Sequence, residues 1–95
     1  MRSYEIVFIV HPELDGDELD GVVNNVEDLI KRNNGKMTKL EPWGLRKLAY
    51  PIKKQQEGRY FLMEFDLEPR NIAEMERVLR LTEPVIRHMI VRLES

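Results

Sequence analysis

Four cationic side chains stand in one short run of the sequence, beside aromatic and apolar residues. The run extends from Trp43 to Lys54, and its cations are Arg46, Lys47, Lys53 and Lys54. Lys and Arg can bind phosphates, while aromatic or apolar groups can contact bases or a partner protein. We therefore interpret the run as a candidate binding segment for a nucleic acid or a protein.

Charge is distributed unevenly along the chain. Residues 3–30 contain many acids and no Lys or Arg, whereas bases dominate residues 31–60. The formal net charge is only -2, so the total hides this separation. Segregation can arise by chance in a short chain. As a functional pattern, it predicts that one face binds an anion and that another faces solvent or a basic partner.

Length and composition predict one folded domain. The chain has 95 residues, of which 42% are hydrophobic, enough for a modest core. No apolar run approaches the roughly 20 residues of a membrane helix, and the N-terminus lacks a signal-peptide pattern. Cysteine is absent, which excludes disulfides, thiolate zinc sites and cysteine nucleophiles and is consistent with a reducing cytoplasm.

Hydrophobic spacing predicts the order strand, helix, strand, strand, helix, strand. The four strands are expected at Arg2–Val10, Lys36–Ile52, Arg59–Leu67 and Val85–Leu93. The first helix is expected to begin after a capping box of Asp15 and Glu18, and to end in a left-handed cap at Asn33-Asn34-Gly35. The second is expected to open at Pro69 and to stop at Glu83-Pro84.

The strand at 36–52 is expected to be bent and to lie at an edge of the sheet. Pro42 and Gly44 predict the bend, and residues 53–58 are expected to form the turn that follows. The residues of this strand that are expected to face the core are Met37, Leu40, Leu45, Leu48 and Tyr50.

This order predicts an α+β ferredoxin-like sandwich (βαββαβ), a four-stranded antiparallel sheet in the order 4-1-3-2 with both helices on one face. The other face would then be uncovered. Its expected residues are Glu5, Val7, Ile9, Tyr60, Leu62, Val85, Arg87, Met89 and Val91. So much apolar surface favours a protein or nucleic-acid partner.

Catalysis is not supported by the sequence, so we expect no enzyme, no cofactor and no metal. His11 and His88 lie far apart and have no nucleophile constellation beside them. His11 is expected in a loop, and His88 at a sheet margin, partly buried. The acidic loop at 11–17 would repel a phosphate substrate.

Two binding classes stay open as alternatives. The run Gly58–Phe65 loosely resembles the third strand of a stand-alone RNA-recognition motif, although only Tyr60 would face outward for base stacking. A small-molecule regulatory domain is the other alternative.

Four segments carry a resemblance to a known family. They are Met1–Glu5, His11-Pro12, Gly44–Lys54 and Gly58–Phe61, and they resemble the bacterial family of small-subunit ribosomal protein number six. The resemblance runs nearly end to end. It implies a structural protein of the cytoplasmic ribosome, with residues 1–95 as a single ferredoxin-like domain. The domain would bind small-subunit ribosomal RNA (central domain) as a heterodimer with the basic small ribosomal protein numbered eighteen.

Site residues follow from the resemblance and from the expected placement of the strands. Arg2 matches the family's N-terminal arginine, and Arg46 and Lys47 match its basic pair. The full set predicted to contact RNA is Arg2, Arg46, Lys47, Lys53, Lys54, Arg59 and Arg87. The set predicted to contact the protein partner is Val7, Ile9, Tyr60, Leu62, Met89 and Val91.

Overall fold

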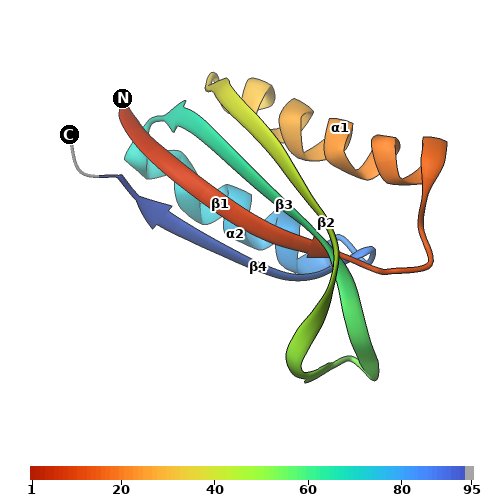
Figure 1. Cartoon of the computed structure of the whole chain (residues 1–95). Coiled ribbons are helices and arrows are strands. Elements are labelled where there is room, and N and C mark those ends of the chain that lie inside the picture. Colours follow the sequence, from red (N-terminus) through yellow and green to blue (C-terminus); the bar gives the residue numbers. More distant parts are fainter. Residues whose placement is uncertain (94–95) are drawn as a thin grey trace.

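A computed structural model describes residues 1–93 as a four-stranded antiparallel sheet with two helices on one face (Figure 1). The elements are β1 Arg2–Val10, α1 Gly16–Arg32, β2 Lys36–Ile52, β3 Gln55–Leu67, a 3-10 turn Pro69–Asn71, α2 Ile72–Leu81 and β4 Val85–Arg92. The spatial order β2-β3-β1-β4 confirms the predicted ferredoxin-like sandwich.

The core lies between the sheet and the helices and follows from the alternation of β1 and β3. The apolar stripe of α1 and, from α2, Met75 and Leu79 close it. The inward residues of the two central strands are Tyr4, Ile6, Phe8, Val10, Phe61, Met63, Phe65 and Leu67. Two cross-strand aromatic pairs tie the strands together, with ring centroids 5.7 Å apart for Tyr4 and Phe65 and 5.3 Å apart for Phe8 and Phe61.

The ends of α1 differ in how they are capped. The predicted N-cap position at Asp15 is confirmed, since its backbone is extended directly before the helix, but its side chain makes no cap hydrogen bond, so the capping box is wrong. The predicted C-terminal cap is confirmed. Asn34 is left-handed, with φ 62°, and the Gly35 N–H donates to the Ile30 carbonyl at 2.9 Å.

The hairpin between β2 and β3 is longer than expected. β3 begins at Gln55, so the predicted turn over 53–58 is wrong and the turn is only Lys53-Lys54. Residues 55–57 are polar, and this part of β3 extends past the helices and covers no core (Figure 1). Of the predicted inward positions of β2, Met37 packs against the core and Leu48 is half-buried, whereas Leu40, Leu45 and Tyr50 are exposed and their assignment is wrong.

The face opposite the helices, here called the open face, is narrower than predicted. A register shift between Ile9 and Val10 places Val85 beside Val10 and in the core, so its assignment to the open face is wrong. Ile9 and Leu62 lie on the open face but are only 6% and 8% exposed. Met89 and Val91, at 55% and 40% exposed, supply most of its accessible apolar surface.

Gly35 is expected to be essential to the α1–β2 connection. A Cβ there would lie 2.6 Å from the Asp66 carbonyl oxygen and 2.6 Å from Leu67 Cδ1, so backbone or core must move. Gly35→Ala should lower the free energy of unfolding by roughly 1–3 kcal/mol, measured by urea denaturation.

Gly21→Ala is the matched control, because a Cβ at this position in α1 meets nothing within 4 Å. It should stabilise the chain by about 0.5–1 kcal/mol through helix propensity. Equal effects of the two substitutions would contradict the close approach at Gly35.

Candidate nucleic-acid and protein interface

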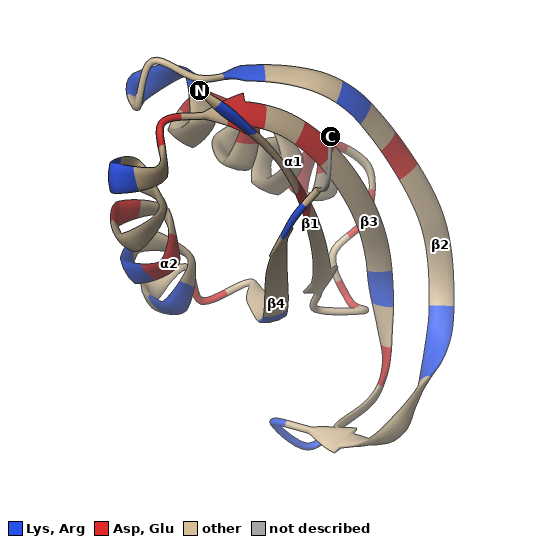
Figure 2. Ribbon diagram, turned by 90° about the vertical axis from the view of Figure 1, so that its left-hand side faces the viewer, with Lys and Arg blue, Asp and Glu red and all other residues tan. Residues whose placement is uncertain are grey.

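The β2–β3 overhang forms a curved arm on the side of the sheet away from the helices (Figure 2). We call residues 43–58 the hairpin arm. Its tip is Lys53-Lys54, with φ 49° and 68°. Two-residue hairpin turns of this kind need left-handed backbone at both positions and favour Asn-Gly, so two lysines there cost stability.

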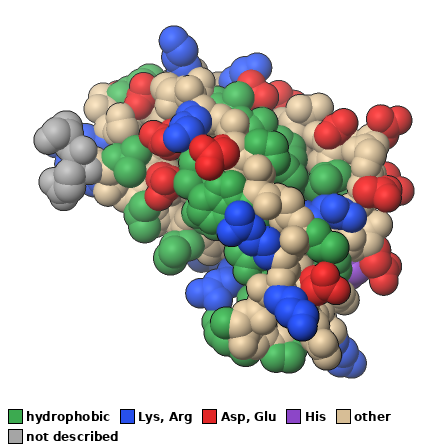
Figure 3. Space-filling model, viewed as in Figure 1, with side chains coloured by type: hydrophobic (Ala, Val, Ile, Leu, Met, Phe, Trp, Pro, Cys, Tyr) green, Lys and Arg blue, Asp and Glu red, His purple; other side chains and the backbone are tan. Residues whose placement is uncertain are grey.

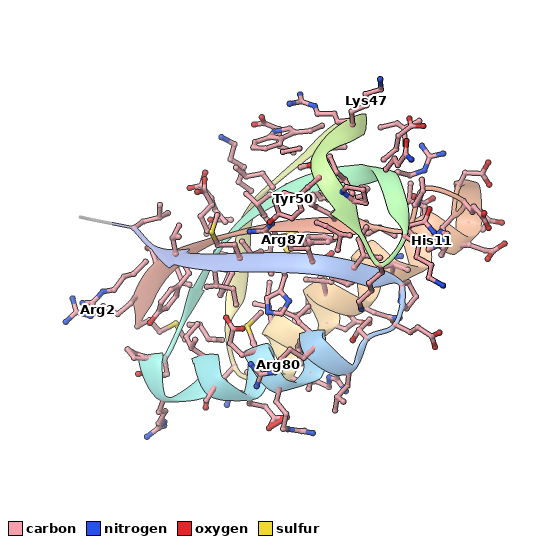
Figure 4. The ribbon with its side chains drawn as sticks, turned by 90° about the horizontal axis from the view of Figure 1, so that it is seen from below. Arg2, His11, Lys47, Tyr50, Arg80 and Arg87 are labelled. Carbon is pink, nitrogen blue, oxygen red and sulfur yellow. The ribbon has the colours of Figure 1, made fainter. Side chains whose placement is uncertain are left out.

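Among residues 1–93, one side-chain hydrogen bond connects the arm to β4. Arg87 on β4 donates to the Tyr50 hydroxyl, and its guanidinium carbon lies 5.9 Å from the Tyr50 ring centroid. Figure 4 shows the two side chains meeting across the open face. Within residues 1–93, no other side-chain hydrogen bond or ion pair joins the arm to β1 or β4.

A groove lies beneath the arm, with a volume of about 190 Å³. We call it the arm groove. It is lined on the sheet side by Val7, Ile9, Tyr60, Arg87, His88 and Met89, and on the arm side by Leu48, Ala49, Tyr50 and Ile52. The walls are therefore largely apolar, and the arm gives the open face a concave site.

Four of the predicted RNA contacts lie together on the arm. Arg46 is held against Trp43, since its Nε donates to the Trp43 carbonyl at 3.3 Å and its guanidinium carbon is 5.3 Å from the indole centroid. Lys47 points away from the sheet (Figure 4). Lys53 and Lys54 are exposed at the tip.

The structure does not bring Arg2 and Arg59 into this group. Arg2 lies at the other end of the molecule from Lys47 (Figure 4). Arg59 is paired with Val10 in the register, and Val10 faces the core, so Arg59 projects toward the helix side. Its Nε is buried without a hydrogen-bond partner in the described chain. Arg87 is exposed and joins the arm through Tyr50.

The predicted partner residues do form a continuous surface. Val7 and Tyr60 are half-buried at the arm groove, Ile9 and Leu62 are buried, Met89 borders the groove on β4, and Val91 is exposed farther along β4. Figure 3 shows exposed apolar side chains over the sheet with Lys and Arg toward the arm.

Sequence reasoning missed Tyr50 as the partner of Arg87. The two residues are 37 positions apart and come from different edges of the sheet, and the spacing within either strand carries no signal of their contact. It also missed the arm groove, because the curvature of the arm decides which residues line it.

A small charged cluster stabilises the base of the arm. The Trp43 indole N–H donates to Glu41 at 2.8 Å, and this is the main cause that holds the pKa of Glu41 below its ordinary value, with Lys39 adding to it. Lys39 Nζ lies 3.4 Å from Glu41 and 3.5 Å from Glu64. The contact with Glu41 raises the pKa of Lys39, and Glu64 adds to this.

Neither histidine forms a reactive site. His11 lies in the loop after β1, as predicted, and its Nδ1 accepts from the Glu13 N–H at 3.2 Å. His88 is partly buried, as predicted, and its Nε2 lies 2.7 Å from Glu76 Oε2. Among residues 1–93, no three His, Cys, Asp or Glu side chains group as a metal site, and no helix is long and apolar enough to cross a membrane.

Comparison with known proteins decides the family. The profile described as Ribosomal protein S6 matches residues 3–92. The chain belongs to this family. It is 48% identical over its full length to the small ribosomal subunit protein bS6 of Geotalea daltonii, of which it covers 74%. It is 43% identical to the bS6 of Caldanaerobacter subterraneus, with both chains covered fully.

The fold of the family is the fold described above. The crystal structure of 30S ribosomal protein S6 from Thermotoga maritima matches with a TM-score of 0.91 and 36% identity, covering 97% of this chain and 87% of that one. The predicted family is confirmed. The prediction of a ribosomal, non-enzymatic protein is confirmed with it, since the relatives are ribosomal proteins.

Glu41 should report its own protonation through Trp43, the single tryptophan. The pKa of Glu41 is lowered in the folded state. Its contacts therefore contribute to stability at pH values above the ordinary pKa of a glutamate, ~4.3. This contribution is lost as the pH falls through the lowered pKa of the folded state. Trp43 fluorescence should therefore show a step whose midpoint lies below the ordinary pKa of a glutamate.

Glu41→Gln should remove this step, because its amide oxygen still accepts from the indole but does not titrate. Circular dichroism at the same pH values serves as the control for unfolding. An identical step in the Gln variant would contradict the assignment to Glu41.

Proposed function

We propose that this chain is a structural constituent of the small subunit of the cytoplasmic ribosome, with residues 1–95 as one ferredoxin-like RNA-binding domain. It binds small-subunit ribosomal RNA, in the central domain, together with the small ribosomal protein numbered eighteen. The observation that carries the proposal is the exposed hairpin arm, which presents Arg46, Lys47, Lys53 and Lys54 beyond the folded body. The RNA and the protein partner rest on the family resemblance and on this surface.

The arm suits a phosphate backbone more than a base sequence. Two of its cations lie on β2 and two at the tip of the hairpin, so they can contact successive phosphates. Arg46 is pre-oriented by Trp43, which lowers the entropy lost on binding. Arg87 has guanidinium N–H groups beyond the one that Tyr50 accepts.

Arg2 and Arg59 have different places in the proposal. Arg2 would contact RNA at the far end of the molecule, separately from the arm. Arg59 Nε is buried and has no partner among residues 1–93, so a bound water would satisfy it, and an RNA contact would have to come from the rest of the guanidinium.

A basic protein partner accounts for the rest of the surface. The acids of residues 3–30 repel phosphates, whereas a basic partner would neutralise them and could supply further RNA contacts. Val7, Ile9, Tyr60, Leu62, Met89 and Val91 form the proposed partner face. Catalysis and a cofactor have no place in this function.

The alternative of a stand-alone RNA-recognition motif has less support. Such a motif stacks bases on aromatic side chains of its central strands. The one candidate, Tyr60, lies in the arm groove and is half-buried.

Removing the two cations of β2 tests the RNA contact. Arg46→Gln with Lys47→Gln should weaken binding of the heterodimer to central-domain RNA by roughly tenfold, and lower the dependence of log affinity on log salt by about 1–2. Filter binding at several salt concentrations measures both quantities.

Arg70→Gln with Arg80→Gln is the matched control, since it removes the same charge from exposed positions in the 3-10 turn before α2 and on α2 itself; Figure 4 shows Arg80 on the helix side. Its affinity should stay within about twofold. Equal losses in the two double variants would show a general charge effect and contradict the arm as the RNA-binding element.

Substitution of the two tip lysines should change the stability of the chain and its RNA binding in opposite directions. Lys53→Asn with Lys54→Gly places the favoured residues at the two left-handed positions, so the free energy of unfolding should rise by roughly 1 kcal/mol. RNA binding by the heterodimer should nevertheless weaken, because two cations are lost. A variant that is more stable and binds RNA as well as the parent would remove the tip from the interface.

A further inference from the structure

The outer part of the hairpin arm is held only loosely by its own backbone. The register between β2 and β3 shifts at the root of the arm, before Gly44, and shifts again between Lys47 and Ile52. In this register, residues 48–51 have no partner on β3. Such irregularities bend a strand and interrupt its ladder of hydrogen bonds. The backbone of the arm therefore does not by itself fix where residues 48–51 lie relative to the sheet.

Two glycines stand where the arm leaves the sheet. Gly44 has φ 84°, a left-handed value that favours glycine, and it lies opposite Tyr60. On β3, a Cβ at Gly58 would lie 2.2 Å from Ile9 Cγ2, so the absence of a side chain lets this strand pass close to β1. Residues that absorb a hinge motion are often small, and the root of the arm has this character on both of its strands.

Apolar packing does not hold the arm at a fixed height above the sheet. The arm groove, about 190 Å³ in volume, lies between Leu48 and Ile52 of the arm and Val7 and Met89 of the sheet. A close-packed interior has few voids larger than a water molecule. The groove is therefore a gap between the arm and the sheet, and the height of the arm needs another determinant.

The contact between Tyr50 and Arg87 supplies that determinant. Arg87 lies opposite Ile9 in the register of β1 and β4, and Ile9 is buried, so the sheet fixes the backbone at Arg87. Tyr50 belongs to the unpaired segment of the arm. The Arg87 guanidinium donates to the Tyr50 hydroxyl and also lies over its ring (Figure 4), which combines a charge-assisted hydrogen bond with a cation–π contact.

We propose that Tyr50 and Arg87 are positioning residues that set the angle of the hairpin arm against the sheet. Their contact holds the four arm cations at a fixed place relative to the body, so the phosphate-binding surface is ordered before RNA arrives. Tyr50 acts through Arg87 and contributes no charge. The consequence for RNA affinity rests on the proposed function, whereas the angle of the arm is a property of the free chain.

A phosphate contact alone is the other role open to Arg87, and Tyr50→Phe distinguishes the two. This substitution removes only the hydroxyl that accepts from Arg87, and it leaves the ring and every charge in place. If Arg87 only contacts phosphate, loss of that hydroxyl has no effect on the arm. If the pair positions the arm, the arm becomes more mobile although the charge of the chain is unchanged.

The angle of the arm is measured on the complete free chain by electron–electron double resonance between two spin labels. The chain has no cysteine, so Gln56→Cys on the arm and Asn24→Cys on α1, both exposed, are the only labelling sites. Tyr50→Phe should broaden the distribution of label distances relative to the parent. Tyr50→Leu, which also removes the ring, should broaden it further. The melting temperature should stay within about 4 °C, because the contact is at the surface.

Tyr60→Phe is the matched control for the distance measurement. Tyr60 lines the same groove, and among residues 1–93 its hydroxyl makes no hydrogen bond to a side chain. Its distance distribution should equal that of the parent. If Tyr50→Phe also gives the distribution of the parent, the backbone alone sets the arm and the inference is overturned.

The functional consequence is measured by filter binding of central-domain RNA, with the small ribosomal protein numbered eighteen at a saturating concentration. Tyr50→Phe should weaken binding by roughly three- to tenfold. The dependence of log affinity on log salt should stay unchanged, because no cation is lost. In a chain that carries Arg87→Met, adding Tyr50→Phe should change the affinity by less than about twofold, because the contact is already absent.

Each other outcome overturns the inference. A loss from Tyr50→Phe that persists in the Arg87→Met chain would show that Tyr50 acts independently of Arg87. Broadened distances with an unchanged affinity would show that the angle of the arm has no effect on RNA binding.

The parent chain separates failure of this inference from failure of the proposed function. If the parent heterodimer does not bind the RNA, the proposed function fails, and the distances in the free chain still decide whether the contact sets the arm. If the parent heterodimer binds and Tyr50→Phe changes neither the distances nor the affinity, only the positioning role is overturned.

Discussion

Side chains alternate between the two faces of the sheet along β1, the strand that lies between β3 and β4. This alternation is the constraint on which the rest of the structure depends. Because successive side chains of a strand point to opposite faces, the buried residues Tyr4, Ile6, Phe8 and Val10 fix the helix side, and Glu5, Val7 and Ile9 must lie on the other. A slip of one residue would place Glu5 in the core and cost several kcal/mol. Core packing thereby also fixes the order of charged and apolar rows on the open face.

The hairpin arm places four cations at exposed positions that are not packed against the core. β2 and β3 pair with each other past the helices (Figure 2), so the side chains there that face away from the arm groove are not packed against the core. The tip lysines occupy left-handed backbone, and the arm meets the sheet through Tyr50 and Arg87. A segment built in this way is less stable locally than the core, as binding elements generally are.

Sequence predicted best where a regular hydrophobic period or a recognisable family motif marks an element. β1 and β2 have the predicted bounds, and the α1 stripe, the strand order and the family follow from periodicity and motifs. The missed features depend on geometry that no local pattern contains. The start of β3 at Gln55 lies in a polar overhang, Val85 turns inward at a register shift, and Tyr50 meets Arg87 because the arm curves. The sequence predicted that four cations lie in one segment. That Arg2 and Arg59 lie apart from these four could be seen only in the folded structure.

The central claim is that this ribosomal protein binds RNA as one half of a protein pair. The most direct measurement is the affinity of the unmodified chain for central-domain ribosomal RNA at moderate salt, with and without the small ribosomal protein numbered eighteen. We predict weak, salt-sensitive binding by the chain alone and affinity at least roughly a hundredfold tighter for the pair, because the partner neutralises the acidic surface and adds phosphate contacts. Tight, specific binding by the chain alone, or no gain from the partner, would contradict the account.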